Sequence, residues 1–198
     1  MKIQVRQAVS EDGGQAVPLL LSAGEALLVP IFGLENKEQA ERFLMSAWSR
    51  GEGQYGYANH WVAECDGQIA GLITCWHDSL PQDFDRQTMS SITHFYGLDG
   101  AMEVIIRSQQ VTAALHPPLV KELALGHLAV DPTYRRVGVA TALINFIESY
   151  ARELQKLSIV LDVHKSNIQA MAFYAAQGFE VRQAVATFLQ MAKGVSPQ

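Results

Sequence analysis

A strand–helix–strand run in the second half of the chain constrains the fold more than any other feature. Lys121–Val130 is apolar and strand-like, Val137–Leu154 repeats apolar residues at helical spacing, and Leu157–His164 is rich in Ile, Val and Leu. Two strands joined in this way lie parallel with a right-handed crossover. A buried parallel strand is a nearly continuous apolar run, as Leu157–His164 is. The chain is therefore predicted to be an α/β protein.

One compact domain accounts for the whole length. The 198 residues are 48% apolar and 18% charged, which excludes a disordered tail protein and allows a sizeable core. We expect a single domain over residues 1–198. Further strands are predicted over Lys2–Ala8, His60–Cys65, Gln68–Trp76 and Phe179–Lys193. Further helices are predicted from Ser10 to about Ala23, over Glu38–Ser49, and from Asn167 to about Gln177. Pro18 is tolerable only near the start of the first of these helices, and Gly178 ends the last.

Asp66-Gly67 predicts a tight hairpin between two of these strands. The two-residue turn pairs Cys65 with Gln68 and Cys75 with Ala58. Seven residues of strand then separate Gln68 from Cys75, or about 23 Å at the rise of a strand. A disulfide allows only about 7 Å between Cα atoms. We therefore expect two free thiols.

Residues 77–120 form an insertion between two strands. At about 44 residues it is far longer than an ordinary loop. Thr88–Tyr96 and Met102–Gln110 are each predicted to form one or two helical turns, and His116-Pro117-Pro118 ends the segment. The apolar side chains spread through it favour a folded segment.

Charge and hydropathy narrow the class of protein. Fifteen basic and twenty acidic residues give a net charge of −5, which disfavours nucleic acid as a partner. No apolar run approaches the roughly 20 residues of a membrane helix, so we expect no membrane partner. Residues 1–10 alternate polar and apolar side chains and lack a signal-peptide core. Together with the free thiols, this predicts a cytoplasmic location.

The stretch Leu128–Thr141 has the pattern of an anion-binding turn. A strand ends, a turn follows, and a helix begins at about Val137. The first N–H groups of a helix lack intrahelical partners and lie at the positive end of its dipole. Arg135 and Arg136 add positive charge beside them. Small side chains would let a phosphate approach, and these are Gly138, Ala140 and Thr141. The dinucleotide fingerprint and the P-loop motif are both absent.

Two motifs here resemble those of a known family. Arg135-x-x-Gly138-x-Ala140 resembles the Gln/Arg-x-x-Gly-x-Gly/Ala signature of the GNAT superfamily of acetyl-CoA-dependent N-acetyltransferases. The preceding Leu128–Pro132 looks like the end of that family's fourth strand. The second signature is resembled by Asn167-x-x-Ala170-x-x-Phe173-Tyr174-x-x-x-Gly178-Phe179. The specific likeness covers Glu122 to about Glu180, and the N-terminal half has no diagnostic motif.

The resemblance implies a fold and a co-substrate. The expected fold is a single-domain GNAT-like α/β fold, with a central mixed, mostly antiparallel sheet, splayed parallel fourth and fifth strands, and flanking helices. The pantetheine arm of acetyl-CoA would pair with the fourth strand, the thioester carbonyl would accept an N–H near Val130, and the pyrophosphate would sit over the N–H groups of Arg136–Thr141. The implied acetyl-CoA-binding residues are Leu128, Ala129, Val130, Arg135, Arg136, Val137, Gly138, Val139, Ala140, Thr141 and Asn167, the last also a plain helix cap.

The family's chemistry needs a proton donor and a proton acceptor. By resemblance, Tyr174 would donate a proton to the coenzyme A sulfur. The family's usual base position falls on Ala124, which cannot act. Glu122 lies two residues earlier on the same strand face and is our candidate base, directly or through water. His127 has the opposite parity and is expected to be buried or to face a helix, and Asp162 is a third candidate.

The resemblance implies an N-acetyltransferase that transfers acetyl from acetyl-CoA to a primary amine of a small molecule or peptide by direct attack. A non-catalytic acetyl-CoA-binding sensor or interaction module is the alternative, and a transferase for longer acyl groups or hydroxyl acceptors is another. An excess of acidic residues in residues 77–120 favours a cationic acceptor. The histidines and cysteines lack metal-ligand spacing, so no metal is expected. We also allow for a homodimer.

Overall fold

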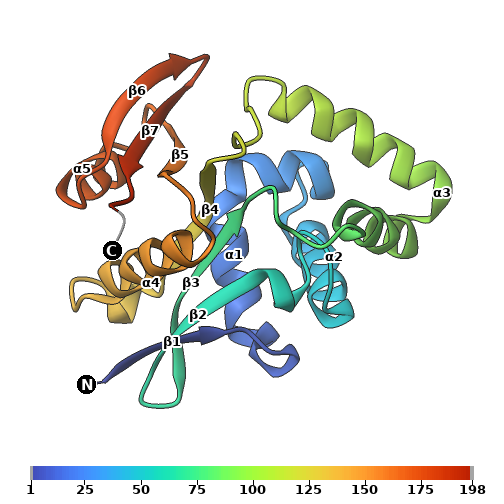
Figure 1. Cartoon of the computed structure of the whole chain (residues 1–198). Helices are drawn as coiled ribbons and strands as arrows, with labels where there is room; N and C mark the ends of the chain where they lie inside the picture. Colours follow the sequence, from blue (N-terminus) through green and yellow to red (C-terminus); the bar gives the residue numbers. More distant parts are fainter. Residues whose placement is uncertain (1, 197–198) are drawn as a thin grey trace.

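The computed structural model describes residues 2–196, which are built on one seven-stranded sheet (Figure 1). Its strands lie in the order β1-β2-β3-β4-β5-β7-β6, and the only parallel neighbours within residues 2–196 are β4 and β5. The predicted α/β class and mixed, mostly antiparallel sheet are confirmed. The strands are β1 (Ile3–Gln7), β2 (His60–Cys65), β3 (Gln68–Trp76), β4 (Glu122–Val130), β5 (Ser158–His164), β6 (Glu180–Val185) and β7 (Phe188–Gly194).

Helices cover both faces of the sheet. Figure 1 shows α4 on one face, α1 and α2 on the other, and α3 beside α2. The helices are α1 (Gly13–Leu28), α2 (Lys37–Arg50), α3 (Phe84–Thr112), α4 (Val139–Glu153) and α5 (Ile168–Ala176), with shorter helical turns at Ser10–Asp12, Val29–Gly33, Tyr57–Asn59 and Pro132–Tyr134. Two apolar clusters result, one between the sheet and α1, α2 and α3, the other between the sheet and α4 and α5. We call these two sides the α1 face and the α4 face.

The first helix differs from its prediction in length and in the place of its proline. It runs to Leu28 with a break at Gly24 (φ −120°, ψ 19°), and Pro18 lies six residues into it. The proline removes the donor to the carbonyl of Gly14, which is exposed and open to water. Glycine at position 24 lets the helix approach the ring of His127 closely, since a Cβ there would come within 2.7 Å of it.

The same region corrects the expectation about apolar runs. Ser10–Gly33 is long and apolar enough, by length and composition, to cross a membrane, although 56% of its most apolar window is buried inside the molecule. Leu20, Leu21 and Leu28 of this stretch belong to the cluster on the α1 face. Its apolar composition therefore serves the core.

The Asp66-Gly67 hairpin is confirmed, but part of its register is not. Both turn residues have positive φ, 49° and 82°, as a type I′ turn requires. Cys65 pairs with Gln68 as predicted. An extra residue in β3 shifts the rest of the ladder by one, so that His60 pairs with Thr74 and Ala58 lies outside the strand. Both cysteines are buried and free.

The insertion is folded, as the apolar side chains in it predicted. Its helix α3 is long and breaks at Gly97, whose φ is 73°. The hydroxyl of Tyr96 donates to the carbonyl of Phe32, and the guanidinium of Arg107 donates to the carbonyl of Ile31. These bonds fix α3 to the turn between α1 and α2. Near the C-terminus, the single strand expected over Phe179–Lys193 is instead the β6–β7 hairpin.

Candidate active site

The two parallel strands part soon after they meet. β4 and β5 pair only over Glu122–Ala124 and Ser158–Val160. We call the last pair, Ala124 and Val160, the branch point. Beyond it β4 stays paired to β3 as far as Val130, but its other edge has no partner strand within residues 2–196. An open strand edge presents N–H and C=O groups that an extended ligand arm can pair with. The predicted splay of the fourth and fifth strands is confirmed.

A bulge changes which side chains of β4 share a face. Gly126 and His127 together lie opposite Thr74, because Cys75 pairs with Leu125 and Ile73 pairs with Leu128. A bulge of this kind reverses the alternation of side chains beyond it. His127 thus lies on the α1 face, where its ring contacts that of Trp76 edge-on at 5.7 Å.

The parity argument made from the sequence is therefore wrong. Glu122 and Ala124 lie on the α1 face, since Ala124 pairs with Trp76. His127 shares that face with them. The expectation that His127 is buried against a helix is nonetheless confirmed, because it packs against Gly24 of α1.

The turn after β4 presents free N–H groups, as its pattern predicted. Helix α4 begins at Val139, two residues later than expected, and no side chain caps it. Gly138 at its N-cap has φ 96°, and Arg136 has φ 62°, which is unusual for a residue with a side chain. The first helical N–H to find a partner is that of Ala142, which donates to the carbonyl of Gly138. By contrast, Asn167 caps α5 by accepting from the Ala170 N–H at 3.1 Å.

A pocket of about 410 Å³ lies over this turn, and we call it the phosphate pocket. It brings together many of the residues predicted to bind acetyl-CoA: Val130, Arg135, Arg136, Gly138, Val139, Ala140 and Thr141. Leu128 and Ala129 lie further back along β4, Val137 is exposed outside the lining, and Asn167 is also outside it.

Sequence reasoning missed three residues of this pocket. Tyr134 comes from the turn, and Phe173 and Gln177 come from α5. The Gln177 amide donates to the Thr141 hydroxyl at 3.4 Å, which links α5 to the start of α4. The sequence could have indicated two of them, because Phe173 and Gln177 are four residues apart and so share one helix face.

Tyr174 lies beside the pocket rather than in its lining. Its side chain is 8% exposed and packs edge-on against Phe179 at 5.7 Å. Its hydroxyl makes no hydrogen bond among the residues described. Burial raises the pKa of Tyr174 to about 12, so the phenol is protonated at neutral pH.

Glu122 is held by two partners. One carboxylate oxygen accepts from Arg182 of β6 at 2.5 Å, and the other accepts from the Leu119 N–H at 3.0 Å. The side chain is 11% exposed. Both carboxylate oxygens are thus engaged in hydrogen bonds within the fold. The role of Glu122 as a base stays a prediction.

Asp162 is placed differently. It lies on β5 two residues beyond the branch point, and its neighbours Leu161 and Val163 belong to the cluster on the α4 face. Asp162 therefore points to the α1 face, the face of Glu122 and Ala124. Burial raises the pKa of its carboxyl, against smaller lowering effects of the His116 charge and of a hydrogen bond from Gln190.

Within the part of the chain that the structure describes, no three His, Cys, Asp or Glu side chains gather as a metal site would need. The chemistry of the site is that of an anion-binding turn, an open strand edge, a carboxylate and a buried phenol.

Comparison with known proteins gives the family. The acetyltransferase (GNAT) family model matches residues 27–179. A 60-residue segment of this chain is 38% identical to N-acetyltransferase 8 of Homo sapiens. The segment covers 30% of this chain and 26% of that protein. The match thus spans about a quarter of that relative's length.

Solved structures share the fold over nearly the full chain. An N-acetyltransferase from Staphylococcus aureus Mu50 superposes with a TM-score of 0.68 at 17% identity, over 97% of this chain and 100% of that one. The PaiA N-acetyltransferase from Thermoplasma acidophilum, solved in complex with coenzyme A, has a TM-score of 0.57 at 16% identity, over 98% and 99%. With the family model covering most of its residues, the chain belongs to the acetyltransferase (GNAT) family.

Proposed function

We propose that this protein transfers the acetyl group of acetyl-CoA to a primary amine of a small molecule or peptide by direct attack of the amine. One observation carries the proposal: the free edge of β4 runs from the branch point to Val130, which lines the phosphate pocket. A ligand with a pyrophosphate at one end and a thioester at the other fits this layout. The relative solved with coenzyme A supports the same ligand.

The residues of the pocket suit acetyl-CoA. The uncapped N–H groups of α4 and the guanidinium groups of Arg135 and Arg136 would hold the pyrophosphate. The open edge over Gly126–Val130 is about 13 Å long at the rise of a strand and would pair with the pantetheine arm. Since Val130 already lines the phosphate pocket, we place the thioester further back along β4, near the branch point.

Two groups are assigned to proton transfer. Asp162 is the base, directly or through one water, because it lies two residues beyond the branch point on the face of Ala124 and no ion pair within residues 2–196 engages it. Tyr174 is the acid, since its buried phenol holds its proton at neutral pH. Ala124 offers no such group, and Glu122 is bound by Arg182.

We keep a cationic amine as the acceptor in this proposal, although fewer acidic residues support it than the sequence suggested. Three acidic residues of the insertion are neutralised by ion pairs: Asp78 with Lys156, Asp83 with Arg86, and Glu103 with Arg107. Asp85 and Asp99 are left exposed and without an ion pair among residues 2–196. Their field would attract a cation weakly and would be screened by salt.

A non-catalytic acetyl-CoA-binding module is the second candidate. It is favoured by one observation, that the family's usual base position is Ala124 and that the nearest carboxylate on β4 is committed to an ion pair.

Calorimetry and coenzyme A release with a panel of amines separate the two. We expect acetyl-CoA to bind and release to depend on the amine. Tyr174→Phe should keep the affinity and lower turnover by about 10- to 1,000-fold, in the range of acid catalysis. Gly138→Glu should abolish binding by placing negative charge in the pocket. Gly138→Ala is its control, since it carries the same backbone strain at φ 96° without the charge, and its Cβ meets only Ile3 at 3.8 Å.

Binding without turnover for every amine would favour the module. Unchanged affinity in Gly138→Glu would remove the pocket as the acetyl-CoA site. We also propose a cytoplasmic location, supported by the two buried free thiols Cys65 and Cys75, which fractionation of cells would test.

A further inference from the structure

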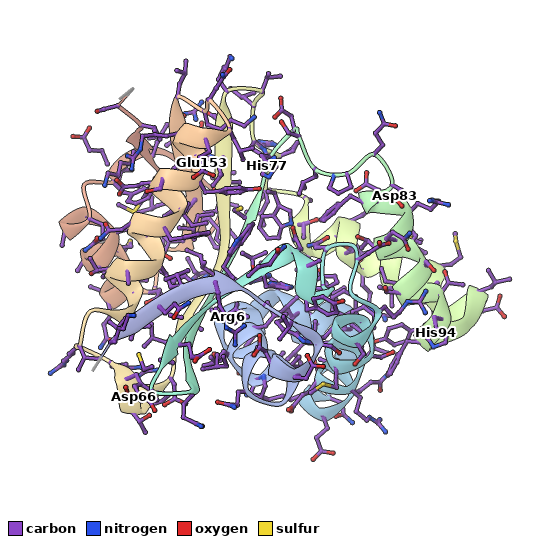
Figure 2. The ribbon with its side chains drawn as sticks, turned by 60° about the horizontal axis from the view of Figure 1, so that its bottom comes forward. Arg6, Asp66, His77, Asp83, His94 and Glu153 are labelled. Carbon is purple, nitrogen blue, oxygen red and sulfur yellow. The ribbon has the colours of Figure 1, made fainter. Side chains whose placement is uncertain are left out.

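A second cavity, of about 340 Å³, lies away from the phosphate pocket. It is walled by the end of β1, the loop between α2 and β2, the start of β2, the segment after β3, the first turn of α3 and the later part of α4. Tyr150, its α4 residue, follows Val139 by eleven residues, or about 16 Å along the helix. Figure 2 shows His77 between α4 and the start of α3, where Asp83 lies. The mechanism proposed above uses none of these residues.

One wall of the cavity is aromatic. The rings of Trp61 and Tyr150 lie 5.0 Å apart at 52°, and the ring of His77 lies 5.8 Å from that of Tyr150. Phe84 faces the cavity from α3. Such surfaces bind apolar groups, and their ring faces attract cations.

The polar part of the lining is made of acceptors and carboxylates. Asn59 is 6% exposed, and its amide nitrogen donates to the Gln54 carbonyl, while its side-chain oxygen accepts no hydrogen bond among the residues described. Glu52 forms no ion pair within residues 2–196, whereas Asp83, also in the lining, is paired with Arg86. No lysine or arginine is among the described residues of the lining. The lining therefore offers one carboxylate without an ion pair, Glu52, and one unfilled acceptor, the Asn59 oxygen.

The hydrogen bonds of His77 determine which of its ring nitrogens carries the proton. The Nδ1 of His77 accepts from the Ser79 N–H at 3.2 Å, which leaves the proton on Nε2, 3.4 Å from the Tyr150 hydroxyl. Burial lowers the pKa of His77, with a further lowering by the Lys156 charge. His77 is thus a neutral donor to Tyr150, and it brings no positive charge to the cavity.

We propose that this cavity is a binding site for a small organic ammonium ion with an apolar body. The ammonium would lie against the faces of Trp61 and Tyr150, with the Asn59 oxygen and the Glu52 carboxylate as its polar partners. This cavity shares no lining residue with the phosphate pocket, and its ligand needs no acetyl-CoA.

Choline tests the proposal, because it is a quaternary ammonium and its uncharged analogue 3,3-dimethylbutan-1-ol has the same shape. The full chain carries three tryptophans, whose indole N–H signals can be followed by NMR in the absence of acetyl-CoA. We expect choline to shift the Trp61 signal saturably and to leave Trp48 and Trp76 in place. The analogue should bind about tenfold more weakly, since it lacks the cation.

Two matched variants locate the charge that contributes. Glu52→Gln should weaken choline binding about threefold, as an exposed charge does. Glu180→Gln makes the same change at another exposed carboxylate, on β6 and outside the lining, and should leave choline binding unchanged. Equal binding of the uncharged analogue, a shift at Trp76 in place of Trp61, or the absence of saturation would each overturn the proposal. None of these outcomes depends on whether the protein acetylates amines.

Discussion

At the scale of single residues, two carboxylates on the same face of the sheet acquire different roles from their surroundings. Glu122 has a guanidinium on one oxygen and a backbone N–H on the other. Among the residues described, Asp162 has only the Gln190 amide as a hydrogen-bond donor, and the Gln190 side-chain oxygen accepts from Gln183. Burial disfavours the charged form of Asp162 and makes it a better proton acceptor than an ordinary aspartate.

We predict that Asp162→Asn and Glu122→Gln separate catalysis from structure. Asp162→Asn should lower kcat/KM by about 10²- to 10⁴-fold, the usual contribution of a positioned base. The wild-type profile should fall as pH drops through the raised pKa of Asp162, because the base must be deprotonated. Glu122→Gln should mainly lower the free energy of unfolding, since it leaves Arg182 without its charge partner. The reverse pattern of the two variants would return Glu122 to the role of base.

At the scale of an element, β4 depends on the bulge at Gly126. A Cβ on Gly126 would lie 2.1 Å from the indole of Trp76, so the glycine allows the ring to lie across the strand. The bulge lies just beyond the branch point, where the free edge of β4 begins. The same bulge brings His127 onto the α1 face, where it meets the break of α1 at Gly24.

We predict that Gly126→Ala destabilises the protein, and that replacing the Trp76 ring by the smaller side chain of leucine reduces this loss of stability. The expected cost is about 1–3 kcal/mol in the free energy of unfolding by urea, as for overpacking in a core. Combined with Trp76→Leu, the cost of Gly126→Ala should shrink. Gly14→Ala is the control, since nothing lies within 4 Å of its Cβ and alanine favours helix by up to about 1 kcal/mol. Additive effects of Gly126→Ala and Trp76→Leu would mean that the contact does not constrain β4.

At the scale of the whole molecule, two buried histidines join the sheet to the α1 side of the core. His60 stacks on Trp48 at 5.1 Å, and its Nδ1 lies 2.7 Å from the Thr74 hydroxyl. Burial lowers the pKa of His60 to about 3, with a smaller effect of the His127 charge. Burial also lowers the pKa of His127 to about 4. Both are neutral in the folded protein at neutral pH.

We predict that acid weakens the fold over a window set by these histidines. The unfolded chain protonates them near pH 6.5, and the folded protein resists down to about pH 4. The contribution to stability is therefore complete above about 6.5 and is lost as pH falls, by up to about 1.4 kcal/mol per pH unit for each histidine. Urea unfolding from pH 7 to 4.5 should show a shallower slope for His127→Gln. The exposed His94 provides the control, and an equal slope in His94→Gln would assign the acid sensitivity elsewhere.

The sequence by itself determined what depends on neighbours along the chain. The period of apolar residues marked the strand–helix–strand unit, Asp66-Gly67 set the hairpin because its residues adopt positive φ, and Arg135 to Thr141 marked the anion-binding turn. These features are local, and a short segment carries enough information for them. From these local features the sequence predicted the position of α4 and most of the residues of the phosphate pocket.

Only the tertiary structure decided which side chains are free to act. The bulge in β4 reverses side-chain alternation, and strict period-two reasoning cannot register one extra residue. Arg182 reaches Glu122 from a strand sixty residues away, and Phe173 enters the pocket from another helix. Such contacts arise from packing between distant segments, whose register and orientation are set by the core as a whole.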